Sequence, residues 1–159
     1  AWYLPEERQI VTKEQILDEL CATLGGRVAE QITFGKISTG ALNDLEKVTK
    51  QAYAMVTYYG MSDKIGNLSF YDSTGQSEYS FSKPYGDDIA KIIDSEAQEF
   101  IRKSYQRAYD LLMQNQSGFV RLAELLLDKE VIFSDDLEKI FGKRTFQEHK
   151  IFEETPKEV

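Results

Sequence analysis

The stretch "STGALNDLEKVTKQAYAMVTYYG", residues 38–60, decides the predicted fold because its apolar residues recur at helical spacing. Steps of three or four residues place them on one face, as in an amphipathic helix that packs against a core. The helix is predicted over about 41–59 and is ended by Gly60, because glycine tolerates the left-handed backbone that often follows a helix. The residues on its buried face are Val48, Ala52, Met55 and Tyr59.

Further helices are predicted on both sides of this stretch. Thr12 and Gln15 have the spacing of a capping box, which starts a helix that ends at Phe34. Ser134 is expected to cap the last helix. The other predicted helices span 87–114, 118–128 and 134–142. Their predicted buried faces include Ile16, Leu20, Cys21, Leu24 and Val28 in the first helix, Ile93, Ala97, Phe100 and Ala108 in the long one, and Phe119, Leu122, Leu125 and Leu126 in the next.

These elements predict a mainly α, multi-helix domain with a short strand at Trp2–Leu4. The domain is expected to span residues 1–142, and the charged residues 143–159 are expected to form a disordered tail. The segment 61–86 reads as a long loop, too aromatic for an idle linker, so part of it is expected to pack on a surface or to move.

A glycine pair, Gly25–Gly26, interrupts the first predicted helix. Each glycine costs a helix interior about 1 kcal/mol relative to alanine. This cost is tolerable if another backbone packs very close to the pair.

The composition excludes several classes of function. The 159 residues carry a formal net charge of −8, which argues against a surface for nucleic acid or for anionic membranes. No apolar run approaches the about 20 residues that a membrane span needs. Cys21 lies in an apolar helical pattern and reads as a small buried side chain in a reducing compartment. The one histidine, His149, lies in the charged tail and reads as a solvated bystander.

Two carboxylates stand out. Asp44 lies in the first turn of the predicted 41–59 helix, yet helical steps lead from it onto the buried face, so it is predicted to lean toward the core. The helix dipole stabilises such an acid by about 0.3–1 kcal/mol, whereas desolvating a carboxylate costs several kcal/mol. Asp44 is thus either a first-turn acid or an acid that needs a cationic partner. Glu30 is either the partner of Arg27 in a surface pair or part of a metal site, but without histidine the two acids are a weak zinc signal.

Two segments carry a resemblance to a known family. "LGGRVAEQITFG" (residues 24–35) and "STGALNDLEKVTKQAYAMVTYYGMSDKIG" (38–66) resemble the peptidase domain of the FtsH family, which comprises membrane-anchored, ATP-dependent AAA+ zinc metalloproteases. The opening "AWYLPEER" is similar to the family's strand near the active site, and "KIIDSEAQEFIRKSYQRAYDLL" and "LLLDKEVIFSDDLEKIFG" are similar to its later helices. The resemblance covers about residues 1–142.

The resemblance implies a zinc site in which two histidines of an H-E-x-x-H helix and one later aspartate hold the metal. By this resemblance Asp44 is the third zinc ligand and Glu30 is an outer-shell group. Trp2, Tyr3 and Leu4 are expected to pair with extended substrate backbone. The family also implies ATP and Mg²⁺ bound by an AAA+ module, assembly into a homo-hexamer, and unfolded or membrane proteins as substrates.

The sequence departs from the family in having no H-E-x-x-H, no AAA+ module and no transmembrane helices. It is expected to be the C-terminal part of a peptidase domain, with no catalytic residue of its own and no activity alone. The parent protein is expected in the inner (plasma) membrane of a bacterium with its peptidase on the cytoplasmic side, or in an organellar membrane. Two alternatives remain, namely a non-catalytic helical module for oligomerisation or interaction, and an acidic helical adaptor unrelated to proteolysis.

Overall fold

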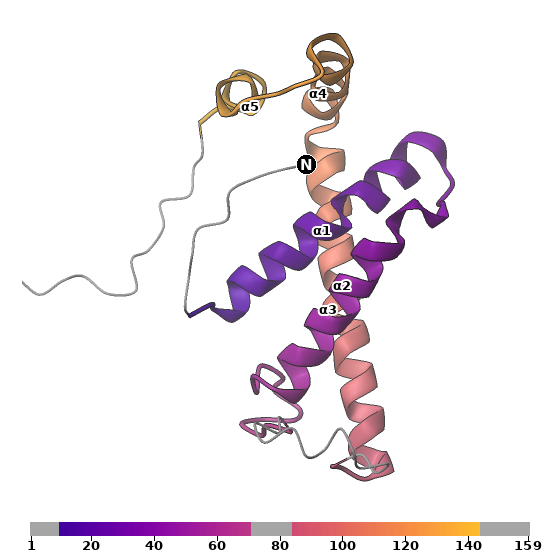
Figure 1. The fold of residues 1–159 in the computed structure, drawn as a ribbon, viewed down its shortest axis with the longest axis vertical. Coiled ribbons are helices and arrows are strands. Elements are labelled where there is room, and N and C mark those ends of the chain that lie inside the picture. Colours follow the sequence, from indigo (N-terminus) through magenta and orange to yellow (C-terminus); the bar gives the residue numbers. More distant parts are fainter. Residues whose placement is uncertain (1–9, 71–83, 144–159) are drawn as a thin grey trace, which may run out of the picture. The chain divides into compact units, whose positions relative to one another are not determined.

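The computed structural model describes residues 10–70 and 84–143, and within these residues it contains helices and no strand (Figure 1). This confirms the mainly α fold, whereas the predicted strand at Trp2–Leu4 and residues 144–159 of the predicted tail lie outside the described residues. Contacts divide the chain into two units, residues 1–113 and 114–159, which are taken separately below. The elements are α1 (Lys13–Phe34), the 3-10 helix η1 (Thr39–Ala41), α2 (Leu42–Thr57), α3 (Asp87–Gln114), α4 (Gln116–Lys129) and α5 (Ser134–Phe141).

Local sequence signals set both ends of α1. The Gln15 N–H donates to Thr12 Oγ1 over 3.3 Å, and the Thr12 N–H donates to Gln15 Oε1 over 2.9 Å, which confirms the capping box. After Phe34, Gly35 takes the left-handed conformation at φ 63° and donates its N–H to the Gln31 carbonyl over 2.9 Å. At this turn the chain leaves α1 and continues toward α2, and glycine avoids the strain that a β-carbon would add in the left-handed conformation.

Helix α2 is shorter than predicted at its C-terminal end. It ends at Thr57 with Tyr58 as its C-cap, so Gly60 does not directly follow the helix as predicted, although it does adopt the left-handed conformation at φ 61°. Tyr59 follows the end of the helix and is 59% exposed, so the prediction that it lies on the buried face is wrong. The apolar pattern continued past the last residue whose backbone is helical.

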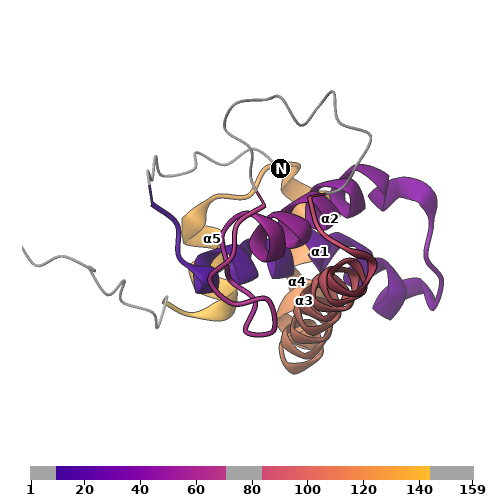
Figure 2. The ribbon, with the colours of Figure 1, turned by 90° about the horizontal axis from the view of Figure 1, so that it is seen from below.

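The core of the first unit lies among α1, α2 and α3 (Figures 1 and 2). The free thiol of Cys21 is buried there, and this burial raises its pKa. The predicted faces of the first three helices are therefore confirmed, apart from Tyr59. Three clusters of buried residues make up the core: Ile16, Leu20, Leu24, Val48 and Met55; Ala52, Val56, Ile65, Ile93 and Ala97; and Cys21, Val28 and Ala108.

The glycine pair of α1 has no close neighbour in the described part of the chain. A β-carbon added to Gly25 or Gly26 would meet no other heavy atom within 4 Å. No described residue therefore supplies the close backbone contact that would make the glycine pair tolerable. The described residues offer no tight contact to offset the cost of about 1 kcal/mol per glycine.

The loop that follows α2 packs on the first unit, as expected, over the part that is described. Ile65 is buried in the second cluster, and the Phe70 N–H donates to the Thr57 carbonyl over 2.7 Å. Residues 71–83 lie outside the described residues.

A buried serine joins this loop to α3. Ser62 is 2% exposed, and its hydroxyl donates to Glu96 Oε2 over 2.8 Å while accepting from the Ile65 N–H over 3.3 Å. The second oxygen of Glu96 pairs with Lys64 Nζ at 2.7 Å. Glu96 thus binds two residues of the loop and satisfies a hydroxyl that has little access to water.

Replacing Glu96 with alanine is expected to cost about 1–3 kcal/mol of unfolding free energy at pH 7, because it leaves the Ser62 hydroxyl buried without its acceptor. Hydrogen bonds from Lys64 and Ser62 lower the pKa of Glu96. Its stabilising effect is therefore present above the ordinary glutamate pKa and lost as the pH falls through the lowered one. Urea denaturation at pH 7 and under acidic conditions measures both effects.

The matched control is Glu99→Ala, since Glu99 lies one turn later on the same helix and pairs with Arg102 at 2.8 Å, in an ion pair whose side chains are 38% and 67% exposed, against 12% for Glu96. Solvent screens such pairs, so its loss should be smaller. Equal losses for the two variants would contradict the assigned role of Glu96.

In the second unit, Asp136 organises the start of α5. The residue before the helix is Phe133 rather than the predicted Ser134, and Asp136 accepts the Phe133 N–H over 3.3 Å from inside the first turn. Asp136 also pairs with Lys129 Nζ at 3.0 Å, and this contact lowers the pKa of Asp136. The prediction of Ser134 as the cap is wrong, because the N-cap position falls one residue earlier, at Phe133, and Ser134 is the first residue of α5.

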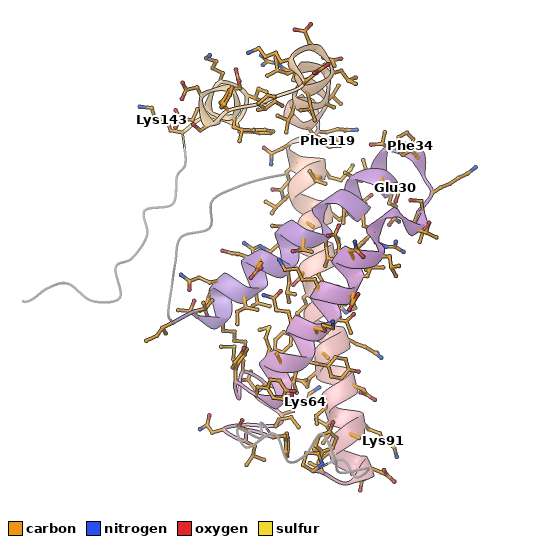
Figure 3. All side chains as sticks on the ribbon, viewed as in Figure 1. Glu30, Phe34, Lys64, Lys91, Phe119 and Lys143 are labelled. Atoms are coloured by element: carbon orange, nitrogen blue, oxygen red, sulfur yellow. The ribbon has the colours of Figure 1, made fainter. Side chains whose placement is uncertain are left out.

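Helix α4 packs against α5 around Gly118. A β-carbon there would lie 2.5 Å from Cε1 of Phe141, so any other residue at this position would require the Phe141 ring to move. Phe119, labelled in Figure 3, is half-buried, as are Leu122 and Leu125. Leu126 is 49% exposed, so its predicted burial is wrong; the eight residues of α5 are too few to cover the whole apolar face of α4.

Candidate functional site

Asp44 occupies the third position of α2, in its first turn. Steps of four and three residues lead from it to the buried residues Val48, Ala52 and Met55, so the predicted face is correct. Asp44 itself is exposed, which corrects the expectation of a desolvated carboxylate. The reason is that the buried stripe of α2 begins one turn later, at Val48.

The carboxylate of Asp44 is accessible and has no ion-pair partner among residues 10–70 and 84–143. The dipole of α2 favours a negative charge in this turn. Asp44 therefore has the properties of a first-turn acid and retains free oxygen atoms that an incoming cation could bind. Both interpretations from the sequence remain compatible with its position.

Glu30 and Arg27 of α1 converge on the backbone of Ser38, the residue that precedes η1. The Ser38 N–H donates to Glu30 Oε2 over 3.1 Å, and Arg27 Nη1 donates to the Ser38 carbonyl over 3.4 Å. The Ser38 hydroxyl in turn accepts the Gly40 N–H over 3.2 Å. Figure 3 shows Glu30 near the end of α1, close to Phe34 and the connection to α2.

These contacts explain the electrostatics of Glu30. Hydrogen bonds from the hydroxyl and the N–H of Ser38 lower the pKa of Glu30, and the charge of Arg27 adds to this effect. The spacing of Arg27 and Glu30 in the sequence predicts only an ion pair between them and does not reveal their shared target. No sequence pattern identifies Ser38 as that target, because the contact depends on the turn at Gly35.

The connection between α1 and α2 also carries three large apolar side chains that are exposed. Phe34 is 71% exposed, Ile37 is 55% exposed and Leu42 is 69% exposed. Leu42 is the first residue of α2, the helix that also carries Asp44 in its first turn.

The described residues do not complete a zinc site by themselves. No group of three His, Cys, Asp or Glu residues within 10–70 and 84–143 could hold a metal ion. A catalytic zinc ion takes three protein ligands and leaves one position for water. Asp44 fits one of these positions as an oxygen ligand, and the other two would have to come from residues outside the described ones. The predicted substrate strand Trp2–Leu4 also lies outside them.

Known proteins resemble this chain over nearly its whole length. The model of a family described as Peptidase family M41 matches residues 1–140. An "ATP-dependent zinc metalloprotease FtsH" from Parabacteroides distasonis is 62% identical over 146 residues, which cover 92% of this chain and 21% of that protein. An Arabidopsis thaliana protein, "ATP-dependent zinc metalloprotease FTSH 3, mitochondrial", is 48% identical over 167 aligned residues, covering 99% of this chain and 20% of that protein.

A mammalian relative shows similar coverage. The "mitochondrial inner membrane m-AAA protease component AFG3L2" of Mus musculus is 44% identical over 154 residues, covering 97% of this chain and 19% of that protein. The chain thus spans about a fifth of the length of the curated relatives it matches. Within the described ranges, no helix is both long and apolar enough to cross a membrane.

Proposed function

The chain belongs to peptidase family M41, the FtsH family, and on this premise we propose that it is the C-terminal part of the peptidase domain of an ATP-dependent zinc endopeptidase. In this proposal residues 1–142 are the peptidase portion and residues 143–159 are a tail. The H-E-x-x-H segment belongs to a part of the protein outside this sequence. The fragment alone is therefore inactive.

The observation that carries the proposal is the exposed carboxylate of Asp44 at the start of a rigid helix. Asp44 is exposed, whereas Val48, one helical turn later on the same face of α2, is fully buried. A ligand placed in this way is held by the core and still reaches an ion from outside. When bound, zinc would supply a Lewis acid and would lower the pKa of a bound water toward about 7.

The chain's own residues would then have separate tasks. Asp44 contributes one oxygen ligand. Glu30 supports the site from outside the ligand shell, and Trp2, Tyr3 and Leu4 pair with the substrate backbone. No other residue of this chain is assigned to the chemical step.

The names of the relatives support further proposals about the parent protein. Relatives named ATP-dependent zinc metalloproteases support zinc in the peptidase domain and ATP with Mg²⁺ in a separate AAA+ module. A relative named a protease component supports assembly, here proposed as a homo-hexamer that degrades unfolded or membrane proteins. We place the parent in a bacterial inner membrane, with an organellar membrane as the alternative.

The test is the number of zinc ions bound per chain. This chain and a version extended upstream through the H-E-x-x-H segment would be purified and analysed for metal side by side. We expect one zinc ion per extended chain and none in the short one, together with cleavage of an unfolded protein by the extended form alone.

The opposite results have distinct meanings. An extended chain without zinc would favour the non-catalytic assembly module. Chelator-sensitive cleavage by the short chain would contradict its predicted inactivity.

A further inference from the structure

We propose that Arg27 and Glu30 are positioning residues that set the location of Asp44 by holding both backbone groups of Ser38. This inference rests on the proposed function, because it concerns the placement of a zinc ligand. The role of Arg27 goes beyond that function: Arg27 is not a zinc ligand, and together with Glu30 it binds the backbone of Ser38.

The side chains of Arg27 and Glu30 converge on one residue, Ser38. Glu30 accepts the Ser38 N–H over 3.1 Å, and Arg27 donates to the Ser38 carbonyl over 3.4 Å. A carboxylate acceptor and a guanidinium donor each form charge-assisted hydrogen bonds, which are stronger than those between neutral groups. Together they bind both the N–H and the carbonyl group of Ser38.

The path along the chain from Ser38 to Asp44 is short. Ser38 caps η1 through its hydroxyl, which accepts the Gly40 N–H over 3.2 Å, and η1 continues into α2 at Leu42. The segment from Ser38 to Asp44 is therefore almost entirely helical. A shift of Ser38 would be passed on to Asp44 instead of being absorbed by a flexible linker.

Helix α2 has no side-chain cap of its own. Ala41 precedes its first residue and makes no side-chain capping bond. The first turn of α2, which carries Asp44, is held by the packing of Ala41 and Leu45 against the core and by the polar contacts of Ser38. Metal ligands tolerate deviations of only about 0.2 Å in distance, so a loose first turn would weaken metal binding.

The test uses the extended chain and measures zinc affinity by competition with a chelator. Arg27→Ala and Glu30→Ala are each expected to weaken zinc binding by about 10–100-fold, as substitutions in outer shells of metal sites do. Glu30→Gln keeps an acceptor oxygen for the Ser38 N–H, so it should retain most of the affinity. Amide hydrogen exchange at Ser38 should become faster in Glu30→Ala.

The matched control is Glu46→Ala. Glu46 lies two residues after Asp44 on α2 and pairs with Lys50 at 2.6 Å, so its removal changes the local charge without touching Ser38. We expect the zinc affinity of Glu46→Ala to stay within about threefold of that of the unmodified chain. Substitutions in the outer shell of a metal site change the affinity by about 10–100-fold, which is clearly more.

The outcomes separate the two proposals. If the unmodified extended chain binds zinc and Arg27→Ala binds it equally well, the positioning role is overturned while the proposed function stands. Unchanged exchange at Ser38 in Glu30→Ala, or equal losses in Glu30→Gln and Glu30→Ala, would also overturn it. If the unmodified extended chain binds no zinc, both proposals fail.

Discussion

Replacing Asp44 with alanine in the extended chain is expected to weaken zinc binding by more than about 100-fold, because outer-shell substitutions alone cost about 10–100-fold. Asp44 would supply one of only three protein ligands, so its loss leaves the metal with two. Cleavage of an unfolded protein should fall together with the zinc content. Metal analysis after dialysis and a cleavage assay on the same samples measure both quantities.

The control for Asp44→Ala is Asp88→Ala. Asp88 is also an acid in the first turn of a helix, α3, and its side chain is 99% exposed. Its removal reproduces the lost interaction with a helix dipole, about 0.3–1 kcal/mol, without affecting the proposed site. If both variants retained zinc equally, Asp44 would be only a first-turn acid.

The largest expected effect on stability comes from Leu24→Ala. Leu24 is 1% exposed and packs with Leu20, Val48 and Met55 where α1 meets α2. Truncating a buried leucine removes apolar contacts and leaves a cavity, which together cost about 2–5 kcal/mol. That is a large fraction of the about 5–15 kcal/mol by which domains are usually stable. Urea denaturation should show a lower midpoint with an unchanged slope.

Leu42→Ala is the matched control for this variant. Leu42 carries the same side chain at the start of α2 but is 69% exposed. Its replacement should change the unfolding free energy by no more than about 0.5 kcal/mol. A loss below 1 kcal/mol for Leu24→Ala would mean that the cluster between α1 and α2 is not packed as described.

The resemblance seen in the sequence agrees with the family match, although that match alone does not assign roles to residues. The motifs around Glu30 and Asp44 led to the FtsH family, and the family model covers residues 1–140. Whether Asp44 binds zinc stays a prediction, because the described residues contain only one of the ligands that the family implies. The substrate strand at Trp2–Leu4 and the boundary at residue 142 also stay predictions.

The sequence by itself determined the helices and most of their buried faces. The capping box at Thr12, the left-handed glycine at Gly35 and the 3.6-residue period of the apolar positions act within one or two helical turns. Such signals can be read from neighbouring residues. They failed at Tyr59 and Leu126, where an apolar pattern outlasts the helix or the element that covers it, and at Ser134, which is the first residue of α5 and not its cap.

Only the tertiary structure decided the contacts that join distant parts of the chain. The burial of Ser62 against Glu96, 34 residues away, and the convergence of Arg27 and Glu30 on Ser38 depend on how the helices pack and where the chain turns. The exposure of Asp44 has the same origin, because helical periodicity gives the direction of a side chain but not the point at which the core ends. Side-chain direction is a local property of the backbone, whereas burial and partner choice depend on elements that the chain brings together only when it folds.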